Sequence, residues 1–132
     1  MAMISTRTHG VLDYVVGAAI TALPHVMKCE RPTATLLKMA GIGAGLYSMM
    51  TDYERGLVKV LPMEAHLALD ALSGATLIGA AVMLEDEAPD VRLTLAGIGA
   101  FEIAVAAMTS PRPHVPGAPS PAGRIAEYAG VS

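Results

Sequence analysis

The chain has 132 residues, of which 53% are hydrophobic and 16% are charged, and its net charge is -3. A soluble domain of this size usually carries more charge and fills its core with large aromatic residues, whereas this chain has one Phe and no Trp. The nine basic residues are scattered, which excludes a phosphate-binding stripe, so we expect no nucleic-acid partner.

Four apolar segments follow one another along the chain, each about 20 residues long. At a rise of about 1.5 Å per residue, a helix of this length crosses a hydrocarbon core of roughly 30 Å. Thr33 is a predicted N-cap, and Pro62 and Pro89 fall in the first turns of their helices, where proline is tolerated. The four predicted membrane spans are residues 8–27, 33–51, 62–84 and 89–109.

The connectors between these segments predict the topology. Residues 28–32 and 85–88 are so short that the helices they join must be antiparallel neighbours. The longer link, residues 52–61, mixes charged and apolar side chains and is expected to lie between lipid headgroups and water. The predicted fold is an all-α bundle of residues 1–110, built from hairpins 8–51 and 62–109, followed by a Pro/Gly/Ala-rich tail, residues 111–132.

The two hairpins resemble two copies of one unit. A His, an Asp and a Gly recur with the same spacing 57 residues apart, at His9, Asp13 and Gly17 and at His66, Asp70 and Gly74. His and Asp are rare in this chain and costly in a membrane, so composition alone does not explain their recurrence. The duplication predicts a pseudo-two-fold axis along the membrane normal, with the first and third helices parallel.

The recurring histidines and aspartates are the candidate site. His9 and Asp13 are four residues apart, as are His66 and Asp70, so each pair lies on one face of its helix. An ionisable group in hydrocarbon costs on the order of 3 kcal/mol, so all four side chains should point into the bundle. Three interpretations are open: a polar cluster that fixes the packing, a proton-handling site, or a cofactor site. In the last, all four residues bind a transition metal, or the two histidines bind haem b.

Two further features lie within the predicted spans. Glu102 has no counterpart in the first hairpin and is expected to be protonated and bonded to a helix carbonyl, with Tyr47 nearby. Gly41, Gly43 and Gly45 lie inside an apolar helix rather than between a strand and a helix, so they predict a close-packing face and not a nucleotide loop.

Three strings resemble the SPW-repeat type of small bacterial four-helix membrane proteins: residues 8–14 (THGVLDY), 51–62 (TDYERGLVKVLP) and 66–70 (HLALD). The resemblance covers about residues 5–109 and implies a four-span bacterial membrane protein of a family whose function is unassigned. The Ser-Pro-Trp that names the repeat is reduced here to Pro24, in Leu23-Pro24-His25, and is absent from residues 80–82. The resemblance implies no catalytic residue.

No catalytic signature is present, so we expect a non-catalytic accessory or scaffold subunit rather than an enzyme. Its expected partners are the lipid bilayer and other membrane subunits, or further copies of the chain, contacted through helix faces and the C-terminal tail. The alternative function is the His/Asp site, as a metal, haem or proton-handling centre. The side that holds both termini carries five of the nine basic residues, which favours a multi-pass protein of the bacterial inner membrane with cytoplasmic termini.

Overall fold

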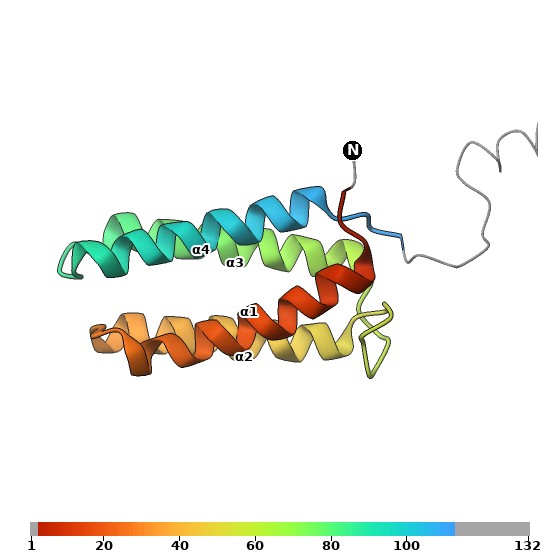
Figure 1. The fold of residues 1–132 in the computed structure, drawn as a ribbon, viewed down its shortest axis with the longest axis horizontal. Coiled ribbons are helices and arrows are strands. Elements are labelled where there is room, and N and C mark those ends of the chain that lie inside the picture. Colours follow the sequence, from red (N-terminus) through yellow and green to blue (C-terminus); the bar gives the residue numbers. More distant parts are fainter. Residues whose placement is uncertain (1–2, 113–132) are drawn as a thin grey trace, which may run out of the picture.

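The computed structural model describes residues 3–112 and contains four helices in that range, which confirms the all-α prediction. They are α1 (Thr6–Val26), α2 (Arg31–Met50), α3 (Met63–Met83) and α4 (Pro89–Met108). Close contacts run mainly within the pairs α1–α2 and α3–α4, which form two antiparallel hairpins lying alongside each other (Figure 1). The predicted tail, residues 111–132, falls almost entirely outside the described residues.

The helix ends differ in detail from the predicted ones. Ser5 caps α1, since its hydroxyl accepts a hydrogen bond from the backbone N–H of Thr8 at 3.2 Å. The prediction of Thr33 as an N-cap is wrong: Glu30 is the N-cap of α2, and Thr33 is fully buried within the helix. Pro32 explains the difference, because proline fits the first turn of a helix, where its missing N–H has no intrahelical acceptor.

Each hairpin contains one close backbone contact between two glycines. A Cβ added to Gly41 of α2 would lie 2.4 Å from the carbonyl oxygen of Gly17 in α1, and one added to Gly99 of α4 would lie 2.3 Å from that of Gly74 in α3. Only glycine permits backbones to approach this closely. The predicted close-packing face is therefore right for Gly41, but a Cβ at Gly43 would meet no atom within 4 Å.

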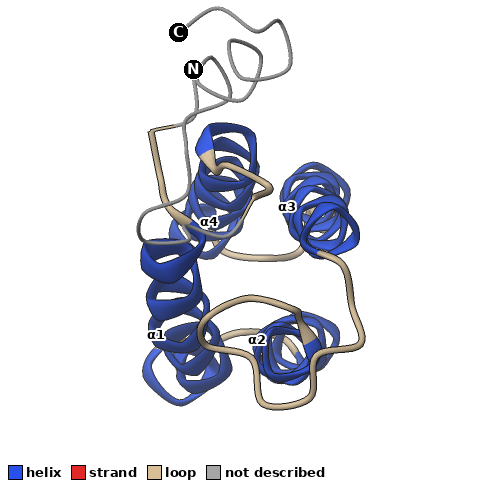
Figure 2. Ribbon diagram, turned by 90° about the vertical axis from the view of Figure 1, so that its right-hand side faces the viewer, coloured by secondary structure: helices blue, strands red, loops and turns tan. Residues whose placement is uncertain are grey.

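Viewed along the bundle, the four helices stand at the corners of a square, with α1 and α3 diagonally opposite (Figure 2). In the half of the bundle near the two short connectors, buried apolar side chains from all four helices form one core cluster: Ile20, Leu37, Leu77, Ala81, Val91 and Leu95. At the other end, where the start of α1, the end of α4 and residues 51–62 lie, the interior is polar. The candidate site occupies that end.

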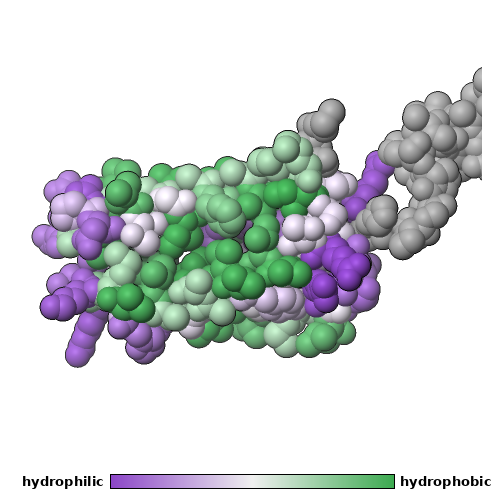
Figure 3. All heavy atoms as spheres, viewed as in Figure 1, coloured by the Kyte–Doolittle hydropathy of each residue, from purple (hydrophilic) through white to green (hydrophobic). Residues whose placement is uncertain are grey.

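Helices α3 and α4 are long and apolar enough to cross a membrane, and only 28% of the most apolar window in each is buried inside the bundle. Figure 3 shows apolar side chains across the middle of one face, with polar residues gathered at both ends. Helices α1 and α2 have the same length but do not reach the same hydropathy.

Candidate metal centre

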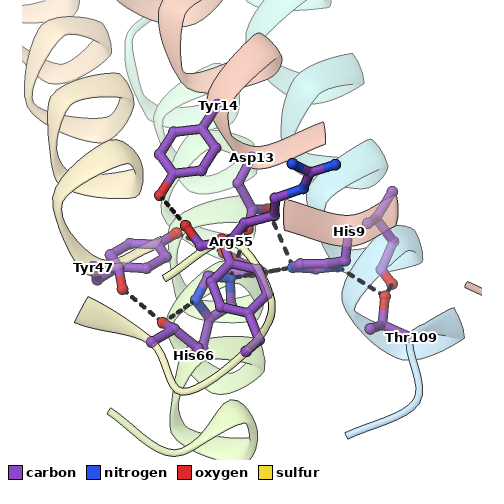
Figure 4. Close-up of polar contacts among 11 residues, drawn as sticks. His9, Asp13, Tyr14, Tyr47, Arg55, His66 and Thr109 are labelled. Atoms are coloured by element: carbon purple, nitrogen blue, oxygen red, sulfur yellow. Dashed lines mark hydrogen bonds and ion pairs between the residues drawn. The ribbon is translucent and has the colours of Figure 1, made fainter. Parts of the chain in front are cut away.

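The four candidate residues converge between α1 and α3. His9 and Asp13 extend from α1, His66 and Asp70 extend from α3, and one side-chain donor atom of each lies within 4.8 Å of the others. The two imidazoles point toward each other, with their Nε2 atoms 3.2 Å apart (Figure 4). The structure thus brings together all four residues that the sequence singled out.

The carboxylates complete this arrangement. From His9 Nε2 the nearest oxygens are Asp70 Oδ2 at 2.9 Å and Asp13 Oδ1 at 3.1 Å. From His66 Nε2 they are Asp13 Oδ2 at 3.2 Å and Asp70 Oδ2 at 3.3 Å. His9 and His66 are 1% and 0% exposed, so bulk water does not form hydrogen bonds with their ring nitrogens. Their lone pairs and protons must be satisfied within the cluster.

Two threonines determine which ring nitrogen of each histidine carries a proton. Thr109 at the end of α4 donates its hydroxyl proton to the carbonyl of Val105 at 2.6 Å, and the same oxygen lies 2.8 Å from His9 Nδ1. A hydroxyl has one proton, so Thr109 can only accept from the imidazole. His9 therefore carries its proton on Nδ1, and in the neutral ring the lone pair of Nε2 points into the cluster.

The same arrangement occurs at the second histidine. Thr51 donates to the carbonyl of Tyr47 at 2.6 Å, and its oxygen lies 2.7 Å from His66 Nδ1. Each threonine thus orients the histidine of the other hairpin. Neither threonine is among the residues predicted for the site, although the sequence carries a signal for them, since a Met-Thr pair ends each hairpin, at positions 50–51 and 108–109.

Two tyrosines orient the carboxylates. Tyr47 of α2 donates to Asp70 Oδ1 at 2.5 Å, and Tyr53 from the link between the hairpins donates to Asp13 Oδ2 at 3.3 Å. Burial and the nearby Asp13 carboxylate raise the pKa of Tyr53, so it stays a protonated donor. Tyr53 is 1% exposed and covers Gly10, where any Cβ would lie within 2.3 Å of its ring. The sequence predicts Tyr47 near Glu102 and predicts no role for Tyr53 in the site.

A small cavity lies beside the cluster, bounded by residues of all four helices, with about 30 Å³ of space for water. Its polar lining consists of His9, Asp13, Tyr47, Asp70 and Glu102. The Glu102 Oε2 atom is buried and has no hydrogen-bond partner within residues 3–112. The expected bond from Glu102 to a helix carbonyl is thus not made by this oxygen.

The geometry does not suit haem. A haem iron with two axial imidazoles lies in a large planar ring, so the two nitrogens must be on opposite sides of that ring. Here the two Nε2 atoms are 3.2 Å apart with carboxylates beside them, and the adjoining cavity measures about 30 Å³. A macrocycle has no space between His9 and His66. Of the cofactors considered from the sequence, a single metal ion fits this geometry.

No protein-family model, curated protein or solved structure matches this chain.

Proposed function

We propose that this chain is a multi-pass membrane protein that binds one divalent transition-metal ion between its two hairpins, through His9, Asp13, His66 and Asp70. The observation that carries the proposal is the spacing of the donor atoms. The two Nε2 atoms and their nearest carboxylate oxygens are 2.9 to 3.3 Å apart, with Asp13 approaching His9 through Oδ1 and His66 through Oδ2, and one donor atom of each residue lies within 4.8 Å of the others. A tetrahedron of Zn–N and Zn–O bonds of about 2.0–2.1 Å has edges of about 3.3 Å.

The protonation pattern supports the same conclusion. With Thr51 and Thr109 accepting from Nδ1, the neutral histidines direct two lone pairs at each other and at two carboxylates. Without a cation those groups repel, whereas a metal ion accepts all of them. Histidines that donate their second N–H to a fixed acceptor are the usual arrangement around protein-bound metals, and ligating carboxylates are themselves hydrogen-bonded, as Tyr47 and Tyr53 provide here.

The charges also balance. Two carboxylates, two neutral imidazoles and one divalent ion sum to zero, which is the least costly state for a polar cluster in a low-dielectric interior. Protonating both histidines would also neutralise the carboxylates, but it would place two N–H groups 3.2 Å apart and facing each other. Among divalent ions, Zn²⁺ has the tetrahedral preference and the tolerance for mixed nitrogen and oxygen ligands that this set requires.

We further propose that all four helices span the membrane. α3 and α4 have the required length and hydropathy, and α1 and α2 run beside them over the same length (Figure 1). Large apolar side chains are exposed on every helix, among them Val15, Met39, Ile42, Leu72, Leu93 and Phe101. Polar residues of α1 such as Asp13 lower its hydropathy but face the interior, where the metal neutralises them.

The duplicated origin of the hairpins belongs to the same proposal. Thr51 and Thr109 make the same contacts, and the close glycine contacts pair Gly41 with Gly17 and Gly99 with Gly74. The repeat is therefore best aligned on Gly41 and Gly99, rather than on the string Ala-Gly-Ile-Gly-Ala that occurs at residues 40–44 and 96–100 and would align Gly41 with Gly97. A pseudo-two-fold axis between α1 and α3 would pass through the metal.

The remaining expectations stay predictions: SPW-repeat membership, a bacterial inner-membrane location, cytoplasmic termini, and a role as an accessory subunit. The exposed apolar side chains suit lipid and a protein partner equally well. A metal centre is compatible with each of these expectations. We propose it as the primary function because the distances between the donor atoms of the cluster support it.

Metal analysis of the purified protein tests the proposal. Protein extracted in detergent and loaded with Zn²⁺ should retain one ion per chain after removal of free metal. Changing His9→Ala together with His66→Ala should abolish retention, whereas His25→Ala, which alters an exposed histidine of α1, should leave it unchanged. Absence of bound metal from the folded wild-type protein, or equal retention in the wild type and both variants, would exclude the metal centre.

A further inference from the structure

We propose that the metal ion expands its coordination from the four protein ligands to five, and that the fifth, exchangeable position faces the cavity and is occupied by a water molecule, with Glu102 as the hydrogen-bond partner of that water. This inference depends on the proposed metal centre and adds a ligand site to it. A metal with a protein ligand at every position is structural, whereas one with a water in an open position can bind and activate small molecules.

The cavity adjoins the metal on one side only. His9, Asp13 and Asp70 all line it, whereas His66 does not. An ion bound among the four donors is therefore exposed to the cavity on the side opposite His66. The approximately 30 Å³ of space for water exceeds the roughly 10–15 Å³ that one water molecule needs. The cavity can hold water beside the metal without any rearrangement.

Glu102 supplies the second polar partner that such a water needs. It lines the same cavity, and its Oε2 atom is buried without a hydrogen-bond partner among the described residues. An unsatisfied buried acceptor costs about 1–3 kcal/mol, and more when it is charged. A water between the metal and Glu102 would satisfy this oxygen. The rest of the lining is mostly apolar, including Leu12, Val16 and Phe101, so the cavity limits the size of any ligand.

The origin of the cavity is visible when the two hairpins are compared. Thr51 bonds to the carbonyl of Tyr47, and Thr109 bonds to the carbonyl of Val105, so Tyr47 and Val105 occupy corresponding positions. Tyr47 extends its ring to Asp70, whereas Val105 is too short to reach Asp13 and instead lines the cavity. The open side of the metal lies where the second hairpin lacks a tyrosine.

Cobalt-substituted protein tests this inference. The Co²⁺-loaded chain, transferred into H₂¹⁷O, should show ¹⁷O coupling from one bound water in electron–nuclear double resonance. Ala44→Leu extends a side chain into the cavity and should abolish the ¹⁷O signal while one Co²⁺ per chain remains. Ala100→Leu makes the same change at an exposed position of α4 and should behave as the wild type.

A second pair of variants tests the bound water even if the Ala44→Leu protein does not fold. Glu102→Leu removes the acceptor and should lower water occupancy at least about tenfold, whereas Glu102→Gln keeps a hydrogen-bonding group and should retain the signal. A Co²⁺-loaded wild type without ¹⁷O coupling would overturn the open position and leave the metal centre intact. A wild type that binds no Co²⁺ would overturn the metal centre itself.

Discussion

The hairpins α1–α2 and α3–α4 contribute the same groups to the site but differ in what surrounds them. Each provides a histidine, an aspartate one turn later and a threonine that bonds to the histidine of the other hairpin. The hydroxyls that reach the aspartates both come from the first half of the chain, from Tyr47 in α2 and Tyr53 in the link. Glu102 and the shorter Val105 are found only in the second hairpin.

This difference separates two kinds of constraint. In the proposed metal centre the histidines, aspartates and threonines of the two hairpins must be matched, because one ion would be held from both sides with similar bond lengths. The residues around the ligands, such as Tyr47, Glu102 and Val105, need not be matched between the hairpins. At these positions the two hairpins can differ, so that one side of the proposed metal centre faces the cavity and the other side is closed. Pairs of variants at matched positions should have equal effects and test the first constraint. Variants at unmatched positions should have unequal effects and test the second.

The largest effect is expected from removing one histidine ligand. His9→Gln and His66→Gln should each weaken Zn²⁺ binding by more than about 100-fold, since an ion held by about 10–16 kcal/mol through four ligands loses about 3 kcal/mol with one of them. Competition titration against a chromophoric chelator measures this. The two losses should agree within about threefold. A variant that retains wild-type affinity would show that its histidine is not a ligand.

The threonines should have the next largest effect. Thr51→Val and Thr109→Val remove the acceptor of each Nδ1–H while keeping the side-chain shape, and changes to such supporting groups cost about 10–100-fold in metal affinity. The same titration applies, and Thr51→Ser and Thr109→Ser should restore binding because the hydroxyl is retained. Equal affinity of the valine and serine variants would contradict the tautomer assignment.

A third comparison concerns stability rather than metal. Gly41→Ala and Gly99→Ala should each destabilise the bundle by about 1–3 kcal/mol, because the new Cβ meets backbone atoms of Gly17 or Gly74 at less than 3 Å. Gly43→Ala and Gly97→Ala are matched controls, since no atom lies within 4 Å of the added group. Thermal unfolding in detergent measures the difference. Because Ala favours a helix over Gly, the controls should be neutral or stabilised, and controls that destabilise as much as Gly41→Ala and Gly99→Ala would show that close packing is not the cause.

Sequence periodicity was sufficient to predict the helices and the four ligands, because both depend on local spacing. A 20-residue apolar segment predicts a helix, and a His and an Asp four residues apart share a face wherever that helix packs. The all-α fold is therefore confirmed, and the structure brings His9, Asp13, His66 and Asp70 together.

The surrounding residues could not be predicted in the same way. Thr109 contacts a histidine 100 positions away in the sequence, and Tyr53 reaches the site from a link expected to lie at the membrane surface. These contacts depend on how the hairpins pack, which no local pattern specifies. Thr33 failed as an N-cap for a local reason, because Pro32 favours the first turn over the position before the helix.

The smallest effect is expected at the tyrosines, where the hairpins are least alike. Tyr47→Phe removes a 2.5 Å hydrogen bond to Asp70, and Tyr53→Phe removes a 3.3 Å bond to Asp13. Hydrogen bonds weaken with distance, so Tyr47→Phe should reduce Zn²⁺ affinity about five- to tenfold and Tyr53→Phe by less than about threefold. Competition titration with both variants at one pH measures the ratio. Equal losses would mean that Asp13 and Asp70 are held alike, and that the two sides of the metal differ only in the cavity beside Val105.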